Sequence, residues 1–282
     1  MTTAAAAHSE LPPLVETPGQ ERLPGKIIWA DLVTPDAARA KQFYGALLGW
    51  TFRDLSTRLE GYTLALLDGA PVAGLVQRSD PPGERHQPAW LTFISTPDVD
   101  STVGLAVAHG GKVLSATHNY PERGRQAMLS DPDGAVFAVL TSSSGDPPDV
   151  MAAPGSWVWS SVITRDPDVE AAFYQVLFGY EVFDSGTDEN TNPLQLASSG
   201  YARAAMNGLP GDPARHHPHW LNFVRVVDAA AAVAKAMALG GRVLVEPRAA
   251  EEGGRIAVVA DPAGAPLGLL ELAANGDEKA TQ

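Results

Sequence analysis

Four of the six tryptophans in this chain of 282 residues stand at regular intervals. Trp29 and Trp90 are 61 residues apart, as are Trp159 and Trp220, and the second pair follows the first at an offset of 130. An indole ring offers a flat face for stacking on an aromatic guest, and it attracts a cation over that face. The spacing therefore points either to binding of planar, π-rich molecules or to a repeated element of core packing.

Polar residues follow the tryptophans at a spacing of two. Because strand side chains alternate between faces, each should share the face of its tryptophan. The four pairs are Trp29 with Asp31, Trp90 with Thr92, Trp159 with Ser161, and Trp220 with Asn222. The carboxylate of Asp31 can pair with an amine, accept from a hydroxyl, or serve as a general base.

Two arginines also occupy matching positions. Arg125 and Arg255 each stand six residues before an Asp-Pro-x-Gly turn. A guanidinium presents a fork of donors that suits a carbonyl or phenolate oxygen, and the alternative is a charge on the outer surface of a strand. His118 and Tyr120, just before Arg125, are expected at the rim of the same site.

The regular spacing belongs to a duplication of the chain. Markers repeated at the offset of 130 include Asp36 to Phe43-Tyr44 with Asp166 to Phe173-Tyr174, Gly110-Gly111 with Gly240-Gly241, and Asp131-Pro132 with Asp261-Pro262. A constant offset predicts two domains without net insertion, at residues 25–141 and 156–273. Residues 142–155 are a Pro/Gly-rich linker, and residues 1–24 and 274–282 are predicted to be disordered tails.

Each domain divides again into two similar halves. Strand-like runs open the halves at residues 27–33, 89–94, 157–163 and 220–224. In the first half a helix begins at Pro35 or Asp36, carries Phe43 and Tyr44 at core spacing, and stops at Gly49. Short strands and an Asp-Pro-x-Gly turn complete the unit. The pattern predicts an α+β fold of four βαβββ modules.

The order of these motifs resembles the vicinal-oxygen-chelate superfamily of glyoxalases, bleomycin-resistance proteins and ring-cleaving dioxygenases. The resemblance rests on the Phe-Tyr pair, Gly49-Trp50 and its counterpart Gly179-Tyr180, the Gly-Gly-x-Val-Leu turn and the Asp-Pro-x-Gly turn. It covers about residues 25–273. It implies two tandem glyoxalase-like domains, each curling its sheet around one cavity, with the family's ligand positions pointing into the cavities.

Metal-binding members of that superfamily carry ligands at three positions that this sequence lets us identify. Those positions hold Trp29, Trp90 and Ala138 in the first copy, and Trp159, Trp220 and Gly268 in the second. None of these side chains ligates a divalent ion, so we expect no metal and no cofactor. If the register is off by one residue, His219 of the cluster His216-His217-Pro218-His219 takes a ligand position, and this alternative stays open.

Composition limits the classes of partner. The formal net charge is −13, and such a surface repels nucleic acids and anionic membranes, so neither is expected as a partner. The chain has no cysteine, which excludes thiolate chemistry and fits a reducing cytoplasm. It lacks an apolar run long enough for a bilayer and a secretory signal pattern. We expect a cytoplasmic monomer, already a pseudo-dimer, or a weak homodimer.

These patterns favour a metal-independent binding protein for a planar aromatic natural product, including a cationic, glycosylated one. It would act in antibiotic self-resistance or as an accessory protein in the biosynthesis. The predicted contacts are Trp29, Asp31, Trp90, Thr92, Arg125, Trp159, Ser161, Trp220, Asn222 and Arg255. One alternative is a metal-independent cyclase, isomerase or hydratase acting on an aromatic polyketide, with Asp31 as general base. Another is a metalloenzyme that uses His219.

Overall fold

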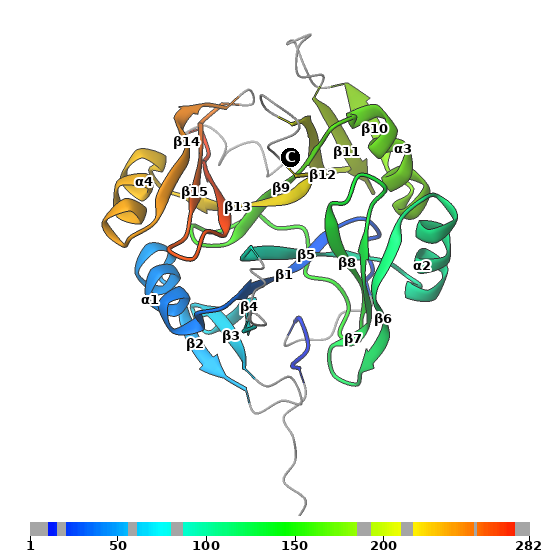
Figure 1. Cartoon of the computed structure of the whole chain (residues 1–282), viewed down its shortest axis with the longest axis horizontal. Coiled ribbons are helices and arrows are strands. Elements are labelled where there is room, and N and C mark those ends of the chain that lie inside the picture. Colours follow the sequence, from blue (N-terminus) through cyan, green and yellow to red (C-terminus); the bar gives the residue numbers. More distant parts are fainter. Residues whose placement is uncertain are drawn as a thin grey trace, which may run out of the picture.

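The computed structural model describes residues 11–15, 21–55, 61–79, 87–184, 193–209, 217–250 and 253–273. The first domain contains β1 (Ile27–Thr34), α1 (Ala37–Leu48), β2 (Thr51–Asp54), β3 (Tyr62–Leu67), β4 (Ala70–Gln77), β5 (Ala89–Ser95), α2 (Val99–Ala108), β6 (Lys112–Tyr120), β7 (Gly124–Ser130) and β8 (Val136–Ser142). The second contains β9 (Trp157–Thr164), α3 (Pro167–Phe178), β10 (Glu181–Asp184), β11 (Leu194–Ser198), β12 (Tyr201–Gly208), β13 (His219–Val226), α4 (Ala229–Ala238), β14 (Arg242–Ala249), β15 (Arg255–Ala260) and β16 (Pro266–Glu271). The two domains repeat one order of elements (Figure 1).

Each domain forms one eight-stranded mixed sheet. The strand orders are β2-β3-β4-β1-β5-β8-β7-β6 and β10-β11-β12-β9-β13-β16-β15-β14. The two modules of a domain join through an antiparallel pair of central strands, β1 with β5 and β9 with β13. The prediction of an α+β fold with four βαβββ modules is confirmed. None of the helices in the described part of the chain combines the length and hydropathy that a membrane crossing needs.

The first helix of each domain begins and ends where the sequence predicts. In α1 the Asp36 side chain accepts a hydrogen bond from the backbone N–H of Arg39 at 2.9 Å, which caps the first turn, and Gly49 follows the last. Asp166 and Gly179 bound α3 in the same way. The Phe-Tyr pair of each helix is buried, so these four rings are core residues.

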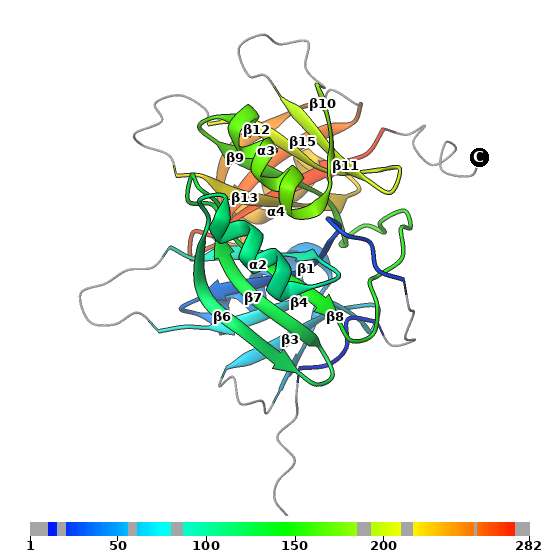
Figure 2. The same ribbon diagram turned by 90° about the vertical axis from the view of Figure 1, so that its right-hand side faces the viewer.

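The two sheets pack through the faces that carry the helices. Helix α1 packs with α4 in one cluster that spans both domains, and α2 packs with α3 in another. The sheets consequently curl away from each other, and their concave faces open at opposite ends of the molecule (Figures 1 and 2). At the centre Thr92 of β5 and Asn222 of β13 exchange hydrogen bonds of 2.9 and 3.1 Å. Since these residues are counterparts in the two copies, a pseudo-twofold axis passes between them.

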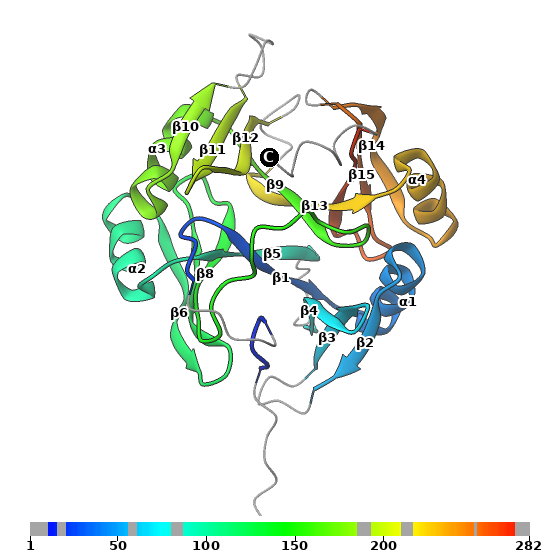
Figure 3. The same ribbon diagram turned by 180° about the vertical axis from the view of Figure 1, so that it is seen from behind.

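Part of the N-terminal region departs from the predicted disordered tail. Leu11, Leu14 and Leu23 are buried, and the short segment 11–15 lies inside the curl of the first sheet (Figures 1 and 3). Residues 11–15 form a Leu-Pro-Pro-Leu-Val run within this largely polar region, and burial of its leucines inside the first sheet stabilises the segment. The rest of the predicted tails, residues 1–10, 16–20 and 274–282, lies outside the described residues.

Candidate ligand-binding site

The concave face of the first domain carries a buried polar group around Asp31. Trp29 and Asp31 both point to this face, and the indole N–H of Trp29 donates to Asp31 Oδ1 at 2.7 Å. The hydroxyl of Tyr62 on β3 donates to the same oxygen at 2.8 Å. Gly74 on β4 leaves the space for this arrangement, because a Cβ there would lie 2.1 Å from Asp31 Oδ1 and from the Tyr62 hydroxyl.

Arg123 is the cation of this face. It lies in the turn between β6 and β7, is 2% exposed, and holds its guanidinium carbon 4.3 Å from the centre of a ring of Trp29. Burial raises the pKa of Asp31, while Arg123 and the two hydrogen bonds act in the opposite direction. Burial and the nearby Asp31 carboxylate also raise the pKa of Tyr120. The face therefore combines an indole, a phenol, a carboxyl group and a guanidinium in a site shielded from water.

The concave face of the second domain is apolar and less buried. Trp159 stands opposite Phe223 across the β9–β13 pair, beside Leu221 and Val258. A Cβ at Gly268 would lie 2.2 Å from the Phe223 ring, so the absence of a side chain there lets the ring lie over β16. Ser161, two residues after Trp159, takes the place of Asp31. Trp159, Ile163 and Ile256 are half-buried, which leaves apolar surface for a guest.

Trp90 and Trp220 lie on the opposite face of their sheets, so the expectation that they share a cavity with Trp29 and Trp159 is wrong. Trp90 packs in the helix-side cluster with Trp50 and Trp157, at ring distances of 6.0 and 5.0 Å. Thr92 and Asn222 do share the face of these tryptophans, but that face is the boundary between the domains.

The helix-side tryptophans belong to two equivalent hydrogen-bond chains, one from each copy, that cross the domain boundary. Trp220 Nε1 donates to the Tyr174 hydroxyl at 2.9 Å, and this hydroxyl donates to Asp131 Oδ2 of the other domain at 2.9 Å. The copy runs from Trp90 to Tyr44 at 3.2 Å and on to Asp261 at 3.1 Å. Each aspartate also accepts from backbone N–H groups of its Asp-Pro-x-Gly turn. The repeated Phe-Tyr, Trp and Asp-Pro-x-Gly motifs therefore join the domains.

The two predicted arginines do not point into the cavities either. Arg125 forms a two-bond ion pair with Asp100 of α2, at 2.8 and 3.0 Å. Arg255 is exposed and shares the face of Ala257, which packs in a helix-side cluster. The arginine of the first cavity is instead Arg123, whose counterpart in the second copy is Gly253. Because Arg123 is not repeated, a search for matching positions misses it.

The expected rim contacts lie close together. Tyr120 packs against the apolar cluster of the first cavity, and the rings of His118 and Tyr120 are 4.5 Å apart.

The side chains at the family's metal positions do not fit a metal. On β5 the cavity-facing residues are Leu91 and Phe93, so the register differs by one residue from that of Trp90. The same shift turns His219 of β13 toward the second cavity, but its neighbours on that face are Leu221 and Phe223. Among the residues that the structure describes, no three His, Asp or Glu side chains come together as a potential metal site.

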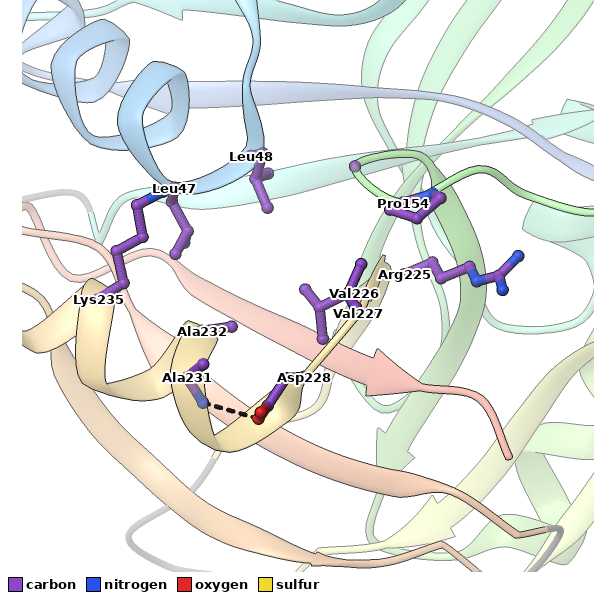
Figure 4. A pocket seen from close by; sticks show the side chains of 11 residues that line it. Leu47, Leu48, Pro154, Arg225, Val226, Val227, Asp228, Ala231, Ala232 and Lys235 are labelled. Carbon is purple, nitrogen blue, oxygen red and sulfur yellow. Dashed lines mark hydrogen bonds between the residues drawn. The ribbon is translucent and has the colours of Figure 1, made fainter. Parts of the chain in front are cut away.

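A separate cleft of about 290 Å³ lies between the end of α1 and the start of α4. Leu47 and Leu48 border it from one domain, and Val226 and Ala232 from the other (Figure 4). Its lining is largely aliphatic and contains none of the residues predicted for the site. Trp29 and Trp159 lie on the two concave faces, not in this cleft.

Comparisons with known proteins place the chain in a family. A model of the Glyoxalase/Bleomycin resistance protein/Dioxygenase superfamily matches residues 26–139, and a model of a Glyoxalase-like domain matches residues 159–270. The chain belongs to this superfamily, so the resemblance seen in its motifs is confirmed.

Two curated relatives have similar sequences over most of their length. "Putative glyoxylase CFP32" of Mycobacterium bovis is 32% identical over 251 residues, covering 87% of this chain and 94% of that protein. "Anthracycline biosynthesis protein DauV" of Streptomyces sp. strain C5 is 32% identical over 262 residues, covering 88% and 94%. Among solved structures, the Mn(II)-bound glyoxalase from Novosphingobium aromaticivorans aligns with a TM-score of 0.61 at 18% identity, over 89% of this chain and 83% of that one. The last likeness concerns the fold alone.

Proposed function

We propose that this chain binds a planar aromatic natural product, without a metal, on the concave face of its second domain. The half-buried indole of Trp159 in an apolar floor carries the proposal, because stacking on an aromatic guest adds about 0.5–1.5 kcal/mol beyond the area buried. Phe223 and Leu221 extend this floor. The first domain is less accessible, since Leu11 and Leu14 cover its concave face.

The named relatives and the net charge support a ligand from an antibiotic pathway. DauV, and DnrV of Streptomyces peucetius, also 32% identical, are named for anthracycline biosynthesis, and an anthracycline is a planar aromatic compound of this kind. The net charge of −13 attracts a cationic ligand such as an amino-sugar glycoside. The chain would therefore sequester or carry such a compound, either for self-resistance or beside a biosynthetic enzyme.

The test is a titration of the full chain with daunorubicin, followed by the fluorescence of the ligand. Trp159→Ala removes the stacking ring and part of the apolar floor, about 1.5–3 kcal/mol, so Kd should rise roughly tenfold to a hundredfold. Val169→Ala is the matched control, because Val169 is 59% exposed on α3 and far from the concave face. If the two variants bind daunorubicin equally well, Trp159 is not part of the binding site.

One observation favours a second function, catalysis in the first domain. Asp31 is a buried carboxyl with a raised pKa, held by Trp29 and Tyr62, as a general base requires. An enzyme would change the absorption spectrum of an aromatic polyketide substrate over hours, and Asp31→Asn would abolish the change. A stable spectrum at saturating ligand would leave binding as the function.

A further inference from the structure

We propose that residues 11–15 are a tethered occupant of a second binding site, on the concave face of the first domain. The ligand that displaces them is a flat aromatic molecule with two neighbouring neutral oxygen acceptors, such as a hydroxyquinone. This site is distinct from the one around Trp159 and lies at the other end of the molecule.

The segment occupies the site as an apolar ligand would. Leu11 and Leu14 are each 4% exposed and pack in one cluster with Trp29, Tyr62 and Phe93. Few other bonds hold the segment: among the described contacts, the backbone N–H of Val15 lies 3.4 Å from Ser144 Oγ. The site thus covers its aromatic floor with two leucines from its own chain.

Arg123 defines the polar part of the ligand. Its Nε donates to the backbone carbonyl of Pro12 at 2.7 Å, so the segment supplies one oxygen acceptor above the indole of Trp29. Its Nη2 is buried without a hydrogen-bond partner. A guanidinium presents parallel donors that two adjacent acceptors satisfy together, and the segment satisfies only one of them. A ligand with two adjacent oxygens fills the unsatisfied position.

Asp31 favours a neutral ligand over an anionic one. Its carboxyl group lies on the same face, hydrogen-bonded by Trp29 and Tyr62, and would repel a second carboxylate placed beside Arg123. In 1,4-dihydroxyanthraquinone, a keto oxygen and the hydroxyl oxygen peri to it are neutral and lie side by side, so both can accept. The second domain lacks this recognition, because Gly253 replaces Arg123 and Ser161 replaces Asp31.

The absence of cysteine in the native chain allows a direct test. Leu14→Cys introduces a single thiol on the buried side of the occupant segment. Val150→Cys introduces one at a position that is 74% exposed. The Leu14→Cys thiol should react with Ellman's reagent on the order of a hundred times more slowly, because reaction requires local opening. Saturating 1,4-dihydroxyanthraquinone should then accelerate it about tenfold by displacing the segment, and should leave Val150→Cys unchanged.

Three further variants keep the result interpretable. Adding Arg123→Met should abolish the acceleration, whereas adding Trp159→Ala should leave it intact even where binding to the second domain is lost. In the full chain, Leu11→Gln with Leu14→Gln should release the segment and lower the Kd of the first domain for the same probe about tenfold or more. An unprotected Leu14→Cys thiol, an acceleration that survives Arg123→Met, or an unchanged Kd after release of the segment would each overturn the proposal.

Discussion

Tyr174→Phe removes one atom from the hydrogen-bond chain between the domains and should be costly. Trp220 is 4% exposed, and its indole N–H loses its only acceptor shown among the described contacts, which costs about 1–3 kcal/mol. The Asp131 carboxyl loses a donor, a bond of about 1.5–3 kcal/mol when the partner is charged. Because the two losses share one hydroxyl and are not additive, we expect about 2–4 kcal/mol in the free energy of unfolding.

Denaturant unfolding at neutral pH measures this loss, and the melting temperature should fall by roughly 4–8 °C in parallel. Tyr44→Phe interrupts the equivalent chain between Trp90 and Asp261 and should cost a similar amount. Tyr201→Phe is the control, since Tyr201 is 55% exposed. If Tyr174→Phe lies within about 0.5 kcal/mol of the parent, the range of ordinary surface substitutions, the chains do not stabilise the domain boundary.

Three further variants test other parts of the structure. Burial and neighbouring carboxylates raise the pKa of Glu170 from 4.5 to about 8, so the folded state loses stability as the pH rises from about 4.5 to about 8. In urea unfolding, Glu170→Gln should therefore be more stable than the parent near pH 8 and equally stable below pH 4.5. Gly74→Ala forces a methyl group between Asp31 and Tyr62 and should cost about 1–3 kcal/mol by the same assay. Arg125→Ala should leave the Kd for daunorubicin unchanged in the fluorescence titration, because that side chain pairs with α2 outside both cavities.

Repetition made the architecture predictable. The offset of 130 revealed the duplication, and capping residues such as Asp36 placed the starts of the helices. Trp29 and Asp31 share a face because their strand alternates without interruption between them. These features depend on local chemistry or on a pattern that occurs twice, and both can be read from a single sequence.

The site was harder to predict because it depends on the face of a strand and on residues that are not repeated. A shift of one residue exchanges the two faces of a strand. The predicted register placed Trp90 and Trp220 in the cavities, whereas they lie at the domain boundary. Arg123 has no arginine counterpart in the second copy. Leu11 and Leu14 lie in a region of polar composition, and only the fold shows what they cover.

The proposed function requires that Trp159, and not the tryptophans at the domain boundary, contacts the ligand. Fluorine NMR of the full chain labelled with 5-fluorotryptophan would give one resonance for each of the six tryptophans, assigned by single Trp→Phe variants. Daunorubicin should shift the resonance of Trp159 and leave those of Trp90 and Trp220 in place. A ligand that shifts Trp90 or Trp220 while Trp159 stays fixed would contradict the assignment of the site.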